Sequence, residues 1–277
     1  MTSIVVWPNF ELPNAPSMWV VGDTLVSGAA GQPLIGDAAK IFGLSVVCRA
    51  PGAQGFFSEV YFAHSFGYCF AGSTLMGQNS YLAIAPLLSN LISATRYVPS
   101  MSDVADFTMR YVGRAYDQYK VRAAAQATFE VCLFGWCHRE QSLEAWHFCP
   151  DLIKGELKMT STRYSSMRFS DFVYLGSHKD RASKLLKEAF GQSAQPGLPA
   201  QRAPRQVVQS LIDDEAYPEI GGDQQLAIAN EHGFQPYTLL RPRVRGRPEA
   251  YMSYLGVELS DENSSVGEAR VGGPGMA

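Results

Sequence analysis

The sequence predicts an α+β fold in which two sheets stack on each other and helices cover both outer faces, a four-layer αββα sandwich. Two observations lead to this prediction. Strand-like and helix-like segments follow one another in blocks, in the order strands, two helices, strands, two helices, strands. The composition is that of a folded chain with a large core, because 46% of its 277 residues are hydrophobic and 18% are charged.

The first part of the chain supplies strands and then two helices. Apolar runs between turn residues predict strands at 4–7, 18–23, 38–47 and 59–70. The run at 18–23 is nearly all apolar, as in a strand that is covered on both faces. Ser73 or Thr74 is suited to cap a first helix, which Pro86 is expected to kink or shorten. A capping box at 100–103 opens the second helix.

The second part of the chain repeats this order. We predict strands at 129–136, 143–148 and 172–177, helices at 179–190 and 206–212, and a last hairpin from 225–230 and 235–240. Residues 151–168 match neither period, so the sequence predicts no element there. From Arg241 the content of charge, Gly and Pro rises, so we predict one domain over 1–240 and a flexible C-terminal extension over 241–277.

Charge and the common ligand residues exclude several classes of function. The formal net charge is -3, so no broad basic surface for nucleic acid is expected. The run of arginines at 241–247 is interpreted as a solvated segment, with docking of nucleic acid or a partner as the alternative. The five cysteines form no CxxC pair and the five histidines lack metal-binding spacing, so we expect buried thiols, no metal site and no cofactor. No apolar stretch reaches the roughly 20 residues of a membrane span and no signal sequence is recognisable, so we expect a cytoplasmic protein.

Four short stretches carry the residues on which a catalytic interpretation depends. If Met1 is removed, Thr2 carries a hydroxyl and a free α-amine, whose pKa of about 8 lets it act as the base for its own hydroxyl. Asp23 ends an apolar strand, Lys40 stands alone among apolar neighbours, and Gly72 lies in a turn of small residues. Each residue also has an ordinary explanation. Thr2 could reflect the usual trimming of Met from the chain start, and Asp23 could be a turn residue. Lys40 could be a charge that protects a strand edge, and Gly72 could serve only a tight turn.

In this order the stretches resemble the proteasome β-subunit family of N-terminal-nucleophile (Ntn) hydrolases, which includes the bacterial peptidase HslV and related bacterial proteasome homologues. The likeness covers roughly the first 95 residues. It is carried by Thr2-Ser3-Ile4, Gly22-Asp23, Lys40-Ile41 and Phe70-Ala71-Gly72-Ser73. The resemblance implies an αββα sandwich, which is the fold that the order of elements also predicts.

The resemblance also implies a role for each residue. Thr2 would be the nucleophile, Lys40 would lower the pKa of its hydroxyl, and Asp23 would keep Lys40 charged and in place. The backbone N–H of Gly72 would face the developing oxyanion, and Ser177 would support the terminal amine.

Substrate-binding residues and two departures from the family pattern follow from the same comparison. The pocket for the substrate residue before the scissile bond would be lined by Ala38, Thr74 and Gln78. An insertion at 49–66 lengthens two strands and their turn, and could alter access to the pocket or contacts between subunits. Ile220 stands where the family has a serine, so Asp214 or Glu219 would have to supply that polar contact.

The sequence therefore predicts a threonine peptidase in which Thr2 attacks a peptide carbonyl and forms an acyl ester that water hydrolyses. The resemblance implies a homo-oligomeric ring or stacked rings around a chamber, a peptide or unfolded protein as substrate, and leaves open an ATP-dependent unfoldase as a partner. Two other hypotheses remain: a structural ring subunit without activity, and an amidase that acts on a small non-peptide amide.

Overall fold

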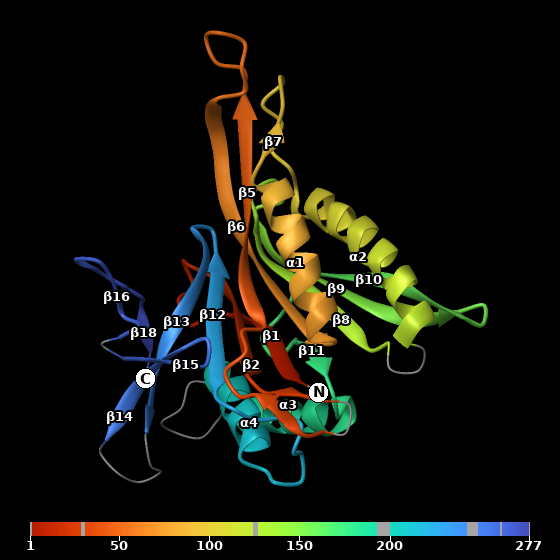
Figure 1. The fold of residues 1–277 in the computed structure, drawn as a ribbon, viewed down its shortest axis with the longest axis vertical. Coiled ribbons are helices and arrows are strands. Elements are labelled where there is room, and N and C mark those ends of the chain that lie inside the picture. The colour runs from red at the N-terminus through yellow and green to blue at the C-terminus, as the bar shows by residue number, and fades with distance from the viewer. Residues whose placement is uncertain are drawn as a thin grey trace.

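The computed structural model of the chain describes residues 2–28, 31–123, 127–192, 200–242, 249–260 and 262–276 (Figure 1). Within these ranges the chain forms two large sheets and two small ones. The α-helices are α1 (Thr74–Leu88), α2 (Met101–Ala123), α3 (Lys179–Gln192) and α4 (Ala203–Ile212), and a short 3-10 helix, η2 (Ala200–Arg202), precedes α4.

The larger sheet has the strand order β11-β1-β2-β12-β13-β14-β15, and β18 pairs with β13. Its strands are β1 (Ser3–Asn9), β2 (Ser17–Asp23), β11 (Val173–Gly176), β12 (Gln224–Asn230), β13 (Gly233–Pro242), β14 (Ala250–Tyr254), β15 (Val257–Leu259) and β18 (Gly275–Met276). The register places Ser3 opposite Gly176 and Asp23 opposite Gln224. The start of the chain therefore lies between two segments from its second half.

The second sheet has the order β10-β9-β8-β6-β5-β7. Its strands are β5 (Ile41–Ala50), β6 (Glu59–Gly72), β7 (Leu91–Ile92), β8 (Phe129–Cys137), β9 (Ser142–Ile153) and β10 (Glu156–Ser165). The β5–β6 hairpin projects well beyond α1 (Figure 1). The two small sheets are β3 (Val26–Ser27) with β4 (Pro33–Ile35), and β16 (Ser265–Val266) with β17 (Ala269–Arg270).

Side chains of β1 and β2 alternate between two cores. Ile4 and Val20 pack between the two large sheets, against residues such as Phe134 on β8. Val5 and Val21 point the other way, into a core shared with α3 and α4. Every residue of both strands is buried, which confirms the prediction of a covered strand at 18–23. A third core joins the second sheet to α1 and α2, with Tyr68, Ile84 and Val112 among its members.

The predicted four-layer αββα sandwich is wrong for this structure. The chain is mostly β-sheet, 43% strand against 25% helix, in several sheets that include a half-barrel. The additional strands lie in segments whose apolar residues show no regular spacing. Met159 is the one buried residue of β10, which pairs with β9 through its backbone along its whole length. Such a strand has no hydrophobic signature in the sequence.

The segments around the predicted boundary at 240 contain further strands. Strand β13 crosses the boundary, and β14 pairs with it along residues 250–254, so the division into 1–240 and 241–277 stays a prediction. Arg241 is not solvated, because its Nε lies 2.7 Å from Asp223 Oδ1 and both side chains are largely buried. Most of the arginine run, 243–248, lies outside the described residues.

Three further expectations concern thiols, membranes and helix ends. All five cysteines are free, and four of them are buried, as predicted. Among the described helices none has the length and apolar character needed to cross a membrane. Pro86 lies inside α1 two residues before the helix ends at Leu88, so it falls near the end rather than dividing the helix.

Candidate active site

Thr2 lies at the start of β1 and is held by the turn that follows β11. The N–H of Ser177 donates to the carbonyl oxygen of Thr2 at 3.0 Å. The preceding residue, Gly176, has φ +113°, and a Cβ at this position would come within 1.8 Å of the same oxygen. Only glycine allows this close approach of two backbones. Ser177 therefore contacts Thr2 through its backbone.

Lys40 lies beside the Thr2 hydroxyl, just before β5. Its Nζ is 3.1 Å from Thr2 Oγ1, 3.0 Å from both carboxylate oxygens of Asp23 and 2.7 Å from the carbonyl oxygen of Leu25. Lys40 and Asp23 are 1% and 0% exposed. A buried ammonium is stable only when it is paired and hydrogen-bonded, and these contacts meet that requirement. The structure therefore brings together the three residues predicted to form the centre of the site.

Backbone N–H groups complete the surroundings of Asp23. Its oxygens accept from the N–H of Ser3 at 2.9 Å, of Leu25 at 3.2 Å and of Gly221 at 3.3 Å. Ser3 lies on β1, Leu25 follows the end of β2, and Gly221 lies in the loop before β12. The carboxylate is thus fixed by the fold itself, and it in turn fixes Lys40.

Burial lowers the pKa of Lys40 below its ordinary value of 10.5, although the charge of Asp23 and its hydrogen bond act in the opposite direction. Removing the ammonium from water favours its neutral form, whereas the carboxylate favours the charged form. The proton of Lys40 is therefore held less tightly than that of an exposed lysine, at a position next to a hydroxyl.

Gln225 links these groups and was missed by the sequence analysis. Its Oε1 accepts from the backbone N–H of Lys40 at 2.9 Å, and its Nε2 donates to the carbonyl oxygens of Asp23 at 2.8 Å and Ala38 at 3.1 Å. Gln225 is 0% exposed. A polar residue directly before the apolar run 226–229 was the available signal, but sequence alone does not show which strands it joins.

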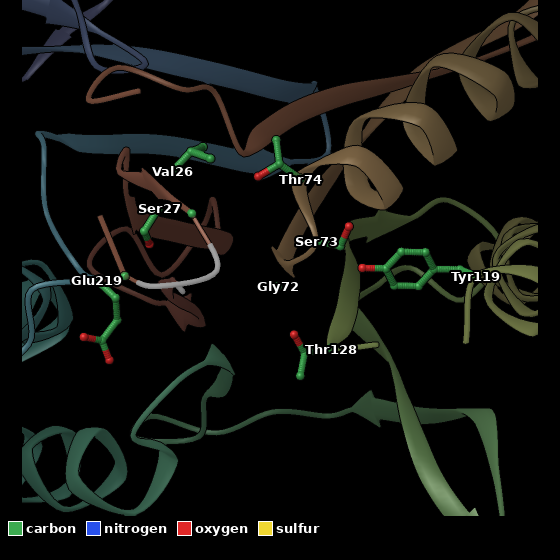
Figure 2. A pocket seen from close by; sticks show the side chains of 10 residues that line it. Val26, Ser27, Gly72, Ser73, Thr74, Tyr119, Thr128 and Glu219 are labelled. Carbon is green, nitrogen blue, oxygen red and sulfur yellow. The ribbon is translucent and has the colours of Figure 1, made fainter. Parts of the chain in front are cut away.

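Gly72 stands at the end of β6 between two hollows. A cleft of about 270 Å³ is lined by Thr2, Gly72, Thr128, Glu130, Ser177 and His178, among others. A second cavity of about 520 Å³ is also lined by Gly72 and Thr128. In Figure 2, Ser73 and Tyr119 face Ser27 and Glu219 across this cavity. Gly72 has φ +89°, and a Cβ there would meet the carbonyl oxygen of Thr128 at 2.3 Å.

The predicted substrate-binding residues divide between these hollows and the protein interior. Thr74 lines the second cavity. Among the described residues that line the two hollows, neither Ala38 nor Gln78 occurs. Ala38 is 7% exposed and donates its N–H to the carbonyl oxygen of Thr24, so it supports the loop before Lys40.

The loop before β12 replaces the expected serine in a way that the sequence did not reveal. Ile220 is buried in the core with α3 and α4. Asp214 accepts the backbone N–H of Ala216 at 3.0 Å within its own turn. Glu219 instead reaches the site, because its Oε1 lies 2.5 Å from Nε2 of His178. Of the two candidates, Glu219 is the one near Thr2.

Carboxylates at the cleft are held in their charged form. Burial raises the pKa of Glu219, but hydrogen bonding and charge, chiefly from His178, leave it lowered. The pKa of Glu130 is likewise lowered, because the hydrogen bonds from His147 at 2.8 Å and Lys179 at 2.7 Å outweigh burial. In the described ranges no group of three or more His, Cys, Asp or Glu residues is arranged to hold a metal ion.

Comparison with known proteins gives a fold neighbour but no sequence relative. No family model matches the chain, and no curated protein matches it. Among solved structures, a mutant of Anbu from Hyphomicrobium sp. strain MC1, labelled Gly-1, is similar to it with a TM-score of 0.51 and 14% identity over 85% of each chain. Anbu is a bacterial proteasome-like homologue of the Ntn peptidases.

The identification with the proteasome β-subunit and HslV family is therefore corrected. A match at 14% identity shows likeness of fold alone, and the absence of a matching family model removes the sequence evidence for membership. The resemblance to that family rests on short motifs around Thr2, Asp23 and Lys40. The likeness to Anbu indicates a proteasome-like fold, and no comparison places the chain in that family.

Proposed function

We propose that this chain is a hydrolase that cleaves peptide bonds with Thr2 as its nucleophile. The observation that carries the proposal is the position of Lys40 Nζ, 3.1 Å from Thr2 Oγ1 and held there by Asp23. The likeness of fold to Anbu supports a peptidase-like activity. Met1 lies outside the described residues, and the proposal requires its removal so that Thr2 has a free amine.

The proposed reaction uses the groups around Thr2 in two stages. The α-amine takes the hydroxyl proton, Oγ1 bonds to the carbonyl carbon, and the leaving amine departs with a proton. Lys40 stabilises the oxygen of Thr2 as negative charge develops there. The N–H of Gly72 would donate to the oxyanion, a contact typically worth about 3 kcal/mol in the transition state. Water then hydrolyses the ester and frees Thr2.

Assembly into a homo-oligomeric ring or stacked rings is part of the proposal. The projecting β5–β6 hairpin supports it, because Phe56 is 73% exposed and Phe57 is 37% exposed near its tip (Figure 1). Aromatic side chains of this kind favour burial against another protein surface. In such a ring the substrate would be a peptide or an unfolded protein that enters the chamber, and an ATP-dependent unfoldase would be a partner to look for.

The test compares Thr2→Ala with Thr162→Ala, a matched change at an exposed position of β10. Intact mass first establishes that Met1 is absent. We expect Thr2→Ala to abolish hydrolysis of a fluorogenic peptide panel and Thr162→Ala to retain it. Unchanged hydrolysis in Thr2→Ala would contradict the proposal.

The same measurements separate the two other hypotheses. A retained Met1 with no hydrolysis in any oligomer would favour a structural subunit, because a blocked amine cannot act as a base. Hydrolysis of small amides but not of peptides, still dependent on Thr2, would favour an amidase.

A further inference from the structure

His178 occupies an unusual position at the cleft. It follows Ser177 directly, has φ +55°, and its carbonyl oxygen accepts the N–H of Ala182 in the first turn of α3 at 2.9 Å. A left-handed backbone is unfavourable for a residue with a Cβ. The fold nonetheless holds His178 in this conformation, and its side chain lines the same cleft as Thr2.

The register of β1 and β11 places His178 beside the start of the nucleophile. Ser3 lies opposite Gly176 in this antiparallel pair, and the N–H of Ser177 donates to the carbonyl oxygen of Thr2. His178, the next residue, lines the same cleft as Thr2.

Glu219 defines which nitrogen of His178 can act on a proton. Nε2 lies 2.5 Å from Glu219 Oε1, and the ring of Tyr217 packs against the imidazole at a centroid distance of 4.6 Å. A carboxylate accepts but does not donate, so Nε2 carries hydrogen and Nδ1 is the acceptor in the neutral ring. A nitrogen oriented in this way by a carboxylate is the arrangement of a general base.

We propose that His178 is the base that activates water for hydrolysis of the acyl ester on Thr2, with Glu219 as its positioning residue. Nδ1 takes a proton from water as the water oxygen bonds to the acyl carbon. The bond between that carbon and Thr2 Oγ1 then breaks, and the proton passes from Nδ1 to Oγ1. The products are a carboxylic acid and free Thr2. This inference rests on the proposed function, because it requires an ester on Thr2.

Other titratable groups at this end of the cleft contribute to its pH dependence. They are Glu130 with its partners His147 and Lys179, Tyr217 against the imidazole, and the Lys40–Asp23 pair beside Thr2.

The experiment uses mature full-length protein and a short acetylated peptide p-nitrophenyl ester as the probe. His178→Gly suits the site because glycine adopts φ +55° without strain and leaves room for added imidazole. We expect the burst of nitrophenolate to remain, the steady-state rate to fall roughly 100-fold, and a mass adduct to accumulate on Thr2. Added imidazole should restore turnover.

Two further variants complete the design. Glu219→Gln keeps the imidazole but removes the carboxylate, so kcat should fall by about tenfold with the burst intact. His232→Gly is the matched control, because His232 is 82% exposed, and it should behave as wild type.

The possible results separate the two proposals. Two results overturn the role of His178 but leave the proposed function intact. One is an adduct on Thr2 with wild-type turnover in His178→Gly. The other is a reduced turnover in His178→Gly that added imidazole does not restore. No adduct on Thr2 in either the wild type or His178→Gly, together with hydrolysis that survives Thr2→Ala, overturns the proposed function itself. A parallel loss of burst and turnover in His178→Gly that imidazole does not reverse also counts against this role.

Discussion

Replacing Lys40 by Met tests the buried pair at the centre of the site. Methionine has a similar volume and no charge, so the change leaves Asp23 as an uncompensated carboxylate that is 0% exposed. Breaking a buried ion pair in this way typically costs about 3–5 kcal/mol. Asp23 keeps the backbone N–H groups of Ser3, Leu25 and Gly221. We therefore expect the lower end, about 3 kcal/mol, a large share of the roughly 5–15 kcal/mol that folded chains usually have.

The assay is equilibrium unfolding in urea of the wild type, Lys40→Met, Asp23→Asn and the double variant. Neutralising both partners removes the unpaired charge, so the double variant should lose about 2 kcal/mol less than the sum of the single changes. Strictly additive losses would refute the view that the two side chains stabilise each other. Each single variant should also stop acylation of Thr2, which mass spectrometry of the N-terminal peptide measures.

The same pair predicts a pH dependence. In the folded state burial lowers the pKa of Lys40 below 10.5, so at pH values just under 10.5 the unfolded chain binds more protons at this residue. Stability gained from this residue should therefore rise with pH in that window, and the rise should be absent from Lys40→Met. A Lys40→Met slope equal to that of the wild type would contradict the assignment.

Two other predictions concern a glycine and a histidine. Gly176→Ala should lower the free energy of unfolding by at least about 2 kcal/mol and should slow acylation of Thr2. The reason is that its Cβ would lie 1.8 Å from the Thr2 carbonyl oxygen, at a residue with φ +113°. Gly155→Ala is the control, because Gly155 also has a positive φ but no neighbour within 4 Å of the added Cβ. Burial and the nearby charge of His138 lower the pKa of His64 to about 4, so the unfolded chain binds more protons between about pH 4 and 6.5 and stability should rise with pH there. His64→Phe should flatten that rise in thermal unfolding scans, and an unchanged slope would show that another group is responsible.

The sequence was most informative where a polar residue interrupts an apolar run. Asp23 and Lys40 could be selected because a carboxylate and an ammonium in apolar segments need partners. Their pairing with each other and with Thr2 was what the family resemblance implied. Their contacts with Gln225 and Gly221 could not be selected, because these depend on β12 pairing with β2 across most of the chain. His178 was missed for the same reason, since its importance comes from the register of β11 with β1.

The fold shows the same division. Strands β1 and β2 were predictable because both of their faces are apolar, and the four helices because of their caps and periodicity. Strands β10 and β14 were not, because they are largely exposed and form through backbone hydrogen bonds to neighbours that sequence alone does not identify. The overall arrangement therefore departed from the predicted sandwich mainly where pairing, and not burial, determines the structure.

The bond between Ser177 and the Thr2 carbonyl oxygen has a consequence for activation. It seats Thr2 at the wall of the cleft, with 4% of its surface accessible. In the proposed function, removal of the residue ahead of Thr2 creates the amine that acts as the base.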